Sequence, residues 1–150
     1  MVGNAKNQCE FDPEKLLLKL DFQVPGDVES IQPSVDEIMA VVGTQECAVG
    51  KEFEVEVALL EALANAVKHG CEDDPSKIVE VCVACERDRG MLIVVRDPGG
   101  GFDPEDIPSP VQGENVFSDH GRGIFLINRL MDEVEYRSGG TEIWMRKNPE

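Results

Sequence analysis

Apolar and polar residues alternate near the start of the chain, and the spacing then becomes helical. In "KLLLKLDFQV" the apolar residues that share one strand face are Leu16, Leu18, Leu20, Phe22 and Val24. Such alternation predicts a half-buried strand, which the turn residues Pro25 and Gly26 end. In "SIQPSVDEIMAVV" the residues at helical spacing are Ile31, Val35, Ile38 and Val42. They predict a helix, with Ser30 as its N-cap.

A longer helix is predicted from Glu52 to His69. Apolar residues that advance by four and three are expected to form its buried stripe; they are Phe53, Val57, Leu60, Ala64 and Val67. Gly70 follows the last of them, where a left-handed C-terminal cap is expected.

The rest of the chain predicts two pairs of strands separated by a helix. The first pair is Ile78–Cys85 and Met91–Asp97, joined as a hairpin through residues 88–90. A segment without clear period, Phe102 to His120, precedes the helix "GRGIFLINRLM". The second pair, Val134–Arg137 and Glu142–Arg146, flanks the turn "SGG".

This order, β-α-α-β-β-loop-α-β-β, favours a two-layer α/β sandwich. We expect a mostly antiparallel mixed sheet with helices on one face. The 150 residues fit one domain, 15–150, after an N-terminal tail of residues 1–14.

Composition and charge narrow the range of partners and compartments. No apolar stretch reaches the roughly 20 residues that span a bilayer, and the N-terminus lacks a signal-peptide pattern. We therefore expect a cytoplasmic protein. The formal net charge of −16 disfavours binding to nucleic acid or an anionic membrane, and it is compatible with a basic protein partner. Acidity that merely keeps the protein soluble is the other interpretation.

The five cysteines do not suggest a disulfide framework, because their number is odd and they are spread along the chain. Cys82 and Cys85 have the gap of a zinc or redox pair. However, they lie in a predicted strand, where side chains three apart point to opposite faces. Buried strand cysteines are the favoured interpretation.

A first polar patch lies on the long predicted helix, in "EALANAVKHG". Glu61 and Asn65 are four residues apart and share a face, with Lys68 and His69 one turn further. The amide oxygen of Asn65 is a suitable Mg²⁺ ligand, and Glu61 is a candidate proton acceptor. Lys68 or His69 is a candidate phosphate contact. Alternatively, the row is an ordinary solvent-facing side of a helix.

A second patch follows a strand that reads as buried, where Asp97 is followed, after Pro98, by Gly99, Gly100 and Gly101. A carboxylate there needs hydrogen-bond donors, such as the amine of a purine. Glycines would let a flat ring approach the main chain. The alternative is a plain loop.

A third patch is "HGRGIFLI", where Gly121 and Gly123 open a predicted helix. The first N–H groups of a helix form a ready anion site, and Arg122 adds a positively charged guanidinium group with several N–H donors. Many helices begin this way without binding an anion. Together, however, the three patches provide a metal ligand with a base, an adenine contact and a phosphate site, which are the parts needed to bind Mg-ATP.

The ordered motifs resemble the N, G1 and G2 boxes of the GHKL ATPases. These motifs are Glu61-x-x-x-Asn65, Asp97-x-Gly99-x-Gly101 and Gly121-x-Gly123. Within that superfamily, "EALANAVKHG" and "GRGIFLINRLMDEVEY…GGTEIWM" are similar to the small anti-sigma-factor serine kinases.

The resemblance implies an ATP site and a role for each residue. Glu61 would be the catalytic base, Asn65 would bind Mg²⁺ and Asp97 would bind the adenine amine. The residues that would shape the pocket or hold the phosphates are Gly99, Gly101, Gly121, Arg122 and Gly123. Phe102 to His120 would form the lid.

The resemblance also implies partners. The expected phosphoacceptor is a serine of an anti-sigma-factor antagonist, and the second expected partner is a sigma factor. A homodimer is a further implication. The alternative function is a regulatory nucleotide-binding module that transfers little or no phosphate.

Overall fold

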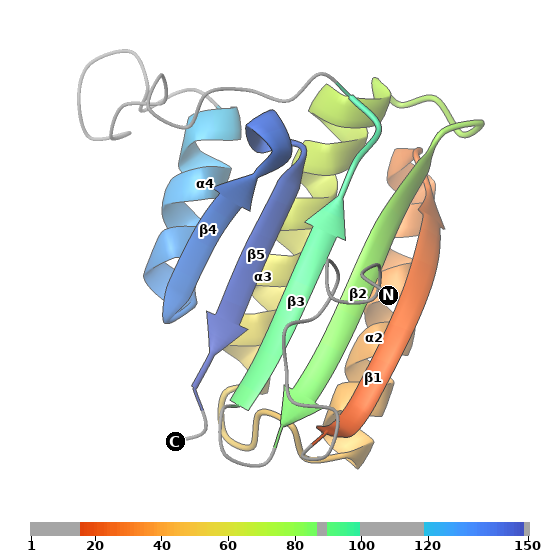
Figure 1. Cartoon of the computed structure of the whole chain (residues 1–150). Coiled ribbons are helices and arrows are strands. Elements are labelled where there is room, and N and C mark those ends of the chain that lie inside the picture. The colour runs from red at the N-terminus through yellow and green to blue at the C-terminus, as the bar shows by residue number, and fades with distance from the viewer. Residues whose placement is uncertain (1–15, 87–89, 100–118, 149–150) are drawn as a thin grey trace, which may run out of the picture.

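The computed structural model describes residues 16–86, 90–99 and 119–148, and for residues 16–18 and 119–123 it describes the backbone alone. Five strands form one sheet in the order β1-β2-β3-β5-β4. Three long helices lie behind this sheet, on one of its faces (Figure 1). This arrangement confirms the predicted α/β sandwich with helices on one face.

The strands are β1 (Leu16–Pro25), β2 (Ile78–Glu86), β3 (Gly90–Arg96), β4 (Glu133–Arg137) and β5 (Glu142–Lys147). All four neighbouring pairs are antiparallel, so the described sheet is antiparallel rather than mixed. In β1, residues 19–24 alternate between exposed and more buried positions, and Val24 is 1% exposed. The period-two pattern therefore predicted the facing of these residues correctly.

The helices are α2 (Ile31–Thr44), α3 (Glu52–Asn65) and α4 (Asp119–Leu130), and a π-helical segment, η3 (Ala66–Cys71), continues α3. The four predicted stripe residues of α2 are the four that are buried. Ser30 occupies the N-cap position without a side-chain cap, and Asp27 instead accepts the Ser30 amide at 2.9 Å. The sequence thus predicted which face of α2 is buried but not how the helix begins.

The predicted buried stripe of the long helix is wrong for most of its length, and of its five residues only Val67 is buried. The buried residues of α3 are Val55, Ala58, Leu59, Ala62 and Leu63. Phe53, which headed the predicted stripe, is 75% exposed. Since α3 packs against α2 and α4 as well as the sheet, apolar residues occupy more than one row of this helix, and periodicity alone selected the wrong row.

The predicted left-handed cap at Gly70 is also wrong. Gly70 is part of η3, and the left-handed conformation falls on Glu72 (φ 54°) and Asp73 (φ 58°). A different constraint acts on Gly70. It is buried against a strand end in the cavity described below.

Two clusters of buried residues fill the two sides of the sheet. The larger joins the sheet to the helices, and the smaller comprises Cys82, Ala84, Leu92, Val94 and Trp144. Cys85 is free and belongs to the larger cluster, whereas Cys82 belongs to the smaller one and is disulfide-bonded. The opposite facing of Cys82 and Cys85 was predicted, but the disulfide was not.

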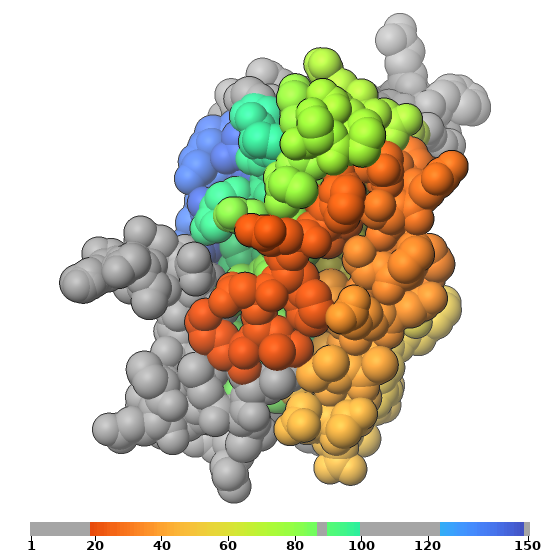
Figure 2. All heavy atoms as spheres, turned by 90° about the vertical axis from the view of Figure 1, so that its right-hand side faces the viewer, coloured from red at the N-terminus to blue at the C-terminus, as the bar shows by residue number. Residues whose placement is uncertain are grey.

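Figure 2 shows the edge of the sheet, with β1 beside α2 and the α2–α3 connection at the lower end of the molecule. Near that end, the Lys147 ammonium lies 2.7 Å from the Glu54 carboxylate and donates to the Leu130 carbonyl. Lys147 therefore links β5, α3 and the end of α4. Within the described part of the chain, no helix has the length and apolarity needed to cross a membrane.

Candidate functional site

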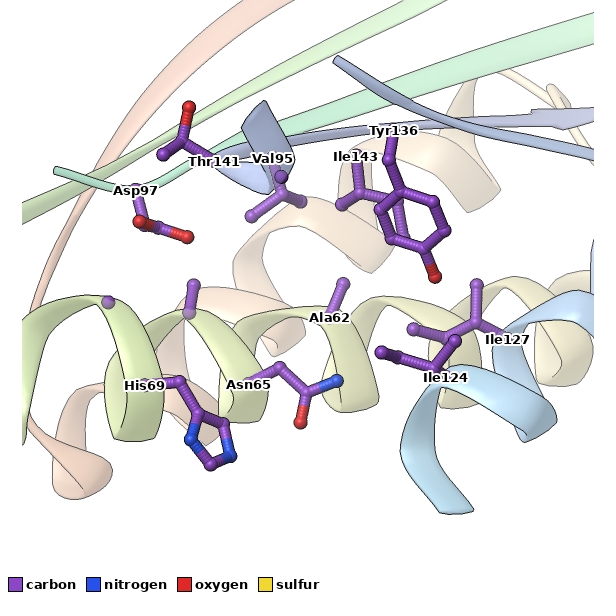
Figure 3. Close-up of a pocket in the computed structure, with 13 residues that line it drawn as sticks. Ala62, Asn65, His69, Val95, Asp97, Ile124, Ile127, Tyr136, Thr141 and Ile143 are labelled. Atoms are coloured by element: carbon purple, nitrogen blue, oxygen red, sulfur yellow. The ribbon is translucent and has the colours of Figure 1, made fainter. Parts of the chain in front are cut away.

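A cavity of about 450 Å³ lies between α3, α4 and the ends of the central strands. Ligand pockets are commonly about 300–1,000 Å³, so the cavity suits a ligand of nucleotide size. Its lining residues are Ala62, Asn65, Ala66, His69, Gly70, Val95, Asp97, Ile124, Ile127, Tyr136, Gly140, Thr141 and Ile143. Figure 3 shows side chains from the strands approaching the helix from one side, with α4 closing one end.

Asp97 provides the carboxylate at the polar end of this cavity. It directly follows β3, and its side chain points from the strand toward η3 (Figure 3). One of its oxygens accepts the Gly99 amide at 2.7 Å. Burial raises the pKa of Asp97, whereas the Gly99 hydrogen bond and the charge of His69 act in the opposite direction. The raised pKa indicates that the ionised carboxylate can be stabilised by a further N–H donor.

Two glycines pack against Asp97 without room for a side chain. A Cβ at Gly70 would lie 2.4 Å from Asp97 Cγ and 2.6 Å from its Cβ. A Cβ at Gly99 would lie 2.7 Å from Gly70 Cα and 2.9 Å from the Gly70 carbonyl oxygen. Because these are backbone atoms or the base of a short side chain, they cannot easily move away. The glycines therefore bring η3 and the end of β3 together around the carboxylate.

Cross-strand contacts fix the position of Asp97. Its amide donates to the Thr141 carbonyl at 2.9 Å. The preceding residue, Arg96, contacts the carboxylate of Glu142 at 2.6 Å and that of Glu80 at 3.1 Å. Burial alone would raise the pKa of Glu142, but hydrogen bonds from Trp144 and Arg96 outweigh it and lower the pKa. This network ties the end of β3 to both neighbouring strands.

Asn65 and His69 line the cavity from the helix side. In Figure 3 their side chains project from α3 and η3 on the side away from the strands, so they lie at the rim. Glu61 is half-buried one turn before Asn65, and Lys68 is exposed; neither lines the cavity. The structure therefore brings Asn65, His69 and Asp97 to one cavity, with Glu61 beside it on the same helix.

The opposite end of the cavity is apolar. Ile124 and Ile127 come from α4, while Tyr136 and Ile143 come from β4 and β5 (Figure 3). Burial raises the pKa of Tyr136 to about 12, and the neighbouring Asn128 side chain opposes the shift. An apolar wall of this kind suits the faces of a planar ring.

The glycine motif of α4 is placed differently from its prediction. The helix begins at Asp119, two residues before Gly121. Gly121 is still in the first turn, where N–H groups lack a helical partner, and Arg122 and Gly123 follow it. Gly100 and Gly101 and most of the predicted lid, residues 102–118, lie outside the described residues.

The sequence did not identify the apolar wall or Thr141 as site residues. The spacing of the apolar wall residues equally suits an ordinary core, so the sequence does not distinguish a cavity wall from a core. These residues are Ile124, Ile127, Tyr136 and Ile143. Thr141 lies in the segment "GGTEIWM", whose similarity to the anti-sigma-factor kinases was the available hint.

A metal at this site would depend on few protein atoms. Among the described residues, no group of three His, Cys, Asp or Glu side chains is placed to hold a metal ion. Mg²⁺, however, is often held by one or two protein oxygens together with substrate phosphates and water. The amide oxygen of Asn65 at the cavity rim fits that mode of binding.

Comparisons with known proteins agree with this geometry. The family described as "Histidine kinase-like ATPase domain" matches residues 24–147. The serine-protein kinases RsbW of Staphylococcus aureus strains MSSA476, MW2 and JH9 are each 34% identical over 136 residues, covering 85% of this chain and 85% of the relative. The chain therefore belongs to the histidine kinase-like ATPase domain family, in the branch of the anti-sigma-factor serine kinases.

Proposed function

We propose that this protein is an ATP-dependent serine-protein kinase that phosphorylates an anti-sigma-factor antagonist and also binds a sigma factor. Family membership and the similarity to serine-protein kinases support the kinase assignment. The cavity supports a nucleotide of ATP size as the ligand.

The observation that carries the proposal is the environment of Asp97. Its carboxylate is held between two strands and two glycines, and burial raises its pKa despite the Gly99 hydrogen bond. The exocyclic amine of adenine would donate to the carboxylate and stabilise its ionised form. Guanine presents a carbonyl oxygen at the equivalent place, which the carboxylate would repel. The site should therefore prefer ATP to GTP.

The phosphates of ATP would extend from Asp97 past Asn65 toward the start of α4. There Gly121, Arg122 and Gly123 would hold the phosphates, with the free amides of the first turn as hydrogen-bond donors. Asn65 would hold Mg²⁺, which neutralises phosphate charge when bound. His69 lines the same cavity and Lys68 is exposed beside it, so both are candidates for phosphate contacts. Gly101 and the segment Phe102 to His120 are assigned to the pocket and its lid by the family resemblance.

Glu61 would act on the acceptor serine. It lies one turn before Asn65 on α3, and its carboxylate would face the γ-phosphate end of a nucleotide whose Mg²⁺ is held by Asn65. Glu61 would orient the serine hydroxyl and accept its proton as the serine oxygen bonds to the γ-phosphorus. The bond between the γ-phosphorus and the bridging oxygen of the β-phosphate then breaks, and ADP leaves.

The antagonist and the sigma factor are proposed as partners from the family resemblance, and a basic partner is compatible with the net charge of this protein. The net charge of −16 favours a basic sigma factor over nucleic acid or an anionic membrane. A homodimer and a cytoplasmic location remain predictions.

A phosphotransfer assay tests the proposal. The protein would be incubated with labelled ATP, Mg²⁺ and the purified antagonist from the same organism. We expect label on one antagonist serine with wild type and a loss of at least about a hundredfold in rate with Glu61→Gln. ATP affinity, measured by calorimetry, should change little in that variant. Glu56→Gln, a carboxylate on the same helix outside the cavity lining, is the matched control and should label normally.

Two results would contradict the proposal in different ways. Tight ATP binding without transfer by wild type would favour the regulatory nucleotide-binding module. Transfer by Glu61→Gln at the wild-type rate would reject Glu61 as the base.

A further inference from the structure

A row of apolar residues lies on the side of α3 that faces away from the sheet. Its members advance by four and three residues, and they are Phe53, Val57, Leu60 and Ala64. Each helical residue turns the side-chain direction by about 100°, so the five buried residues of α3 point to the opposite side. Phe53 is 75% exposed, and the other three are half-buried. The outward side of a surface helix is ordinarily polar, so this row departs from the usual pattern.

The start of the row is the part that the core uses least. In Figure 1, α3 lies between α2 and α4, and its most extensive contacts are with these helices and η3. Leu60 and Ala64 pack against the larger buried cluster, to which Phe53 and Val57 do not belong. Val49, in the turn before α3, is 67% exposed. Because clustered exposed apolar residues mark interaction sites more often than scattered ones do, the start of α3 is a candidate docking surface.

The surface around the row is acidic. Residues 31–65, which include α2 and α3, contain seven acidic residues and one basic residue, Lys51. All eight are exposed or half-buried. Glu56 is four residues from Leu60, and Glu61 is four residues from Val57, so a carboxylate lies on each side of the row. These charges attract a basic protein surface and repel an anionic membrane or nucleic acid.

We propose that this row is the docking surface for a protein partner that presents a positively charged amphipathic helix. The apolar side chains of that helix pack against Phe53, Val57 and Leu60, and its lysines and arginines face Glu56 and Glu61. The spacing of the row is the one through which amphipathic helices are recognised along one face. From Phe53 to Ala64 the row extends about 16 Å along the axis, which a helix of about 11 residues covers.

This docking surface is separate from the nucleotide cavity and goes beyond the proposed kinase function. None of its four apolar residues lines the cavity. Phe53 lies about 18 Å along the helix axis from Asn65. A substitution at Phe53 should therefore leave ATP affinity unchanged, and peptide binding can be measured without nucleotide or phosphotransfer.

A peptide-binding experiment tests the proposal. The probe is a synthetic helix of about 18 residues, with leucines at the spacing of the row and lysines and alanines elsewhere. A scrambled peptide of the same composition keeps the charge and loses the apolar face. By fluorescence anisotropy, the wild-type protein should bind the first peptide more tightly than the scrambled one, and added salt should weaken both interactions.

Variants of Phe53 make the result specific to the row. Phe53→Ser should weaken binding of the amphipathic peptide by about tenfold or more, because a buried phenylalanine contact is lost. Phe53→Leu, which keeps an apolar side chain, should retain most of the affinity. Both variants should melt at the wild-type temperature, since Phe53 is mostly exposed in the protein alone.

Val28 provides the matched control. It is also exposed, at 55%, and lies elsewhere on the surface, in the short helix η2 (Val28–Ser30). Only its backbone amide contacts Asp73, at 3.1 Å, so Val28→Ser keeps that hydrogen bond. This variant should bind both peptides as the wild type does.

Four results would overturn the proposal. The first is equal affinity of wild type and Phe53→Ser for the amphipathic peptide, and the second is equal affinity of wild type for the two peptides. The third is a wild-type dimer that Phe53→Ser converts into a monomer in light scattering, because a second copy of the chain would then occupy the row. The fourth is binding to phosphatidylserine vesicles that Phe53→Ser abolishes, because a lipid surface would then be the partner.

Discussion

The two ends of the cavity are built on different principles. At the polar end, Asp97 and the two glycines are in such close contact that a single added Cβ would overlap existing atoms. At the apolar end, Ile124, Ile127 and Tyr136 are side chains that can be exchanged for others of similar size. At the polar end, ligand specificity depends on fixed backbone positions and one carboxylate. At the apolar end, the side chains contribute only a surface of suitable shape.

This contrast predicts how each end tolerates change. Overlap with backbone cannot relax without moving η3 or the end of β3, so substitutions at the polar end should impair the whole site. Volume-conserving changes in an apolar wall usually cost less than about 1.5 kcal/mol. Substitutions from each end should therefore separate into two groups, and the predictions below are arranged from the largest expected effect to the smallest.

Gly70→Ala should have the largest effect on nucleotide binding. Its Cβ would lie 2.4 Å from Asp97 Cγ, so the carboxylate or η3 has to move. Overpacking of this kind costs about 1–3 kcal/mol, and we expect ATP affinity to fall by about a hundredfold at the upper limit. Calorimetric titration with ATP measures the change.

Gly43→Ala is the control for that variant. Gly43 is also helical, but a Cβ there meets nothing within 4 Å. Replacement of a helical glycine by alanine should stabilise the fold by about 0.5–1 kcal/mol and leave ATP affinity unchanged. Equal effects of the two variants on ATP affinity would show that close packing at Gly70 is not what holds the carboxylate.

Asp97→Asn should weaken ATP binding by about tenfold, because a charge-assisted hydrogen bond becomes a neutral one. It should also reduce the preference for ATP over GTP. Parallel titrations with the two nucleotides measure both changes. An unchanged preference for ATP over GTP would show that Asp97 does not contact adenine.

The same variant should stabilise the protein without ligand at neutral pH. The pKa of Asp97 is raised in the fold. Its contribution to folding stability is therefore fully present below the ordinary carboxyl pKa, and it is lost as pH rises through the pKa of the folded state. Asp97→Asn should therefore melt at a higher temperature than wild type at pH 7, and the difference should disappear below about pH 4. Thermal unfolding of both proteins across this pH range tests the direction of the difference in melting temperature.

The two ends also differ in how far the sequence revealed them. Asp97 and its glycines could be identified because a carboxylate followed by glycines after a buried strand is an unusual local pattern. The role of Gly70 could not be, since its neighbour Asp97 is far away in the sequence and a glycine after an apolar helix also suits a C-cap. Packing against Asp97, and not backbone conformation, explains this glycine.

The helices show the same limit. The stripe of α2 was predicted fully because its apolar residues form one row. In α3, Val55 and Leu59 are buried while Phe53 is exposed, although both rows have helical spacing. The choice between them depends on where α2 and α4 pack, which is tertiary information. For the same reason Ile127 and Tyr136 could be assigned to a core but not to a cavity.

Ile127→Val should have a moderate effect on stability and a small one on binding. Ile127 is 0% exposed, and Ile→Val substitutions in cores cost about 0.5–1.5 kcal/mol. Because the β-branched shape is kept, ATP affinity should change by less than about threefold. Chemical denaturation and calorimetry measure the two effects. A loss of affinity as large as that of Gly70→Ala would contradict the proposed contrast between the two ends.

Tyr136→Phe should have the smallest effect at neutral pH. The ring and its contacts are kept, and only the buried phenol oxygen beside Asn128 is removed, at a cost of about 1 kcal/mol or less. Asn128 still donates to the Ile124 carbonyl at 2.9 Å, which limits the damage. ATP affinity should therefore stay within about twofold of wild type.

Alkaline pH turns this small effect into a sharp test of burial at the apolar end. The pKa of Tyr136 rises from 10.0 to about 12 in the fold, so its contribution to stability is full below pH 10 and is lost as pH rises through the folded value. Wild type should therefore lose stability between pH 10 and 12 more steeply than Tyr136→Phe, as measured by denaturant unfolding at each pH. Parallel pH profiles would mean that the phenol is solvated, and the cavity would then be open to water at both ends.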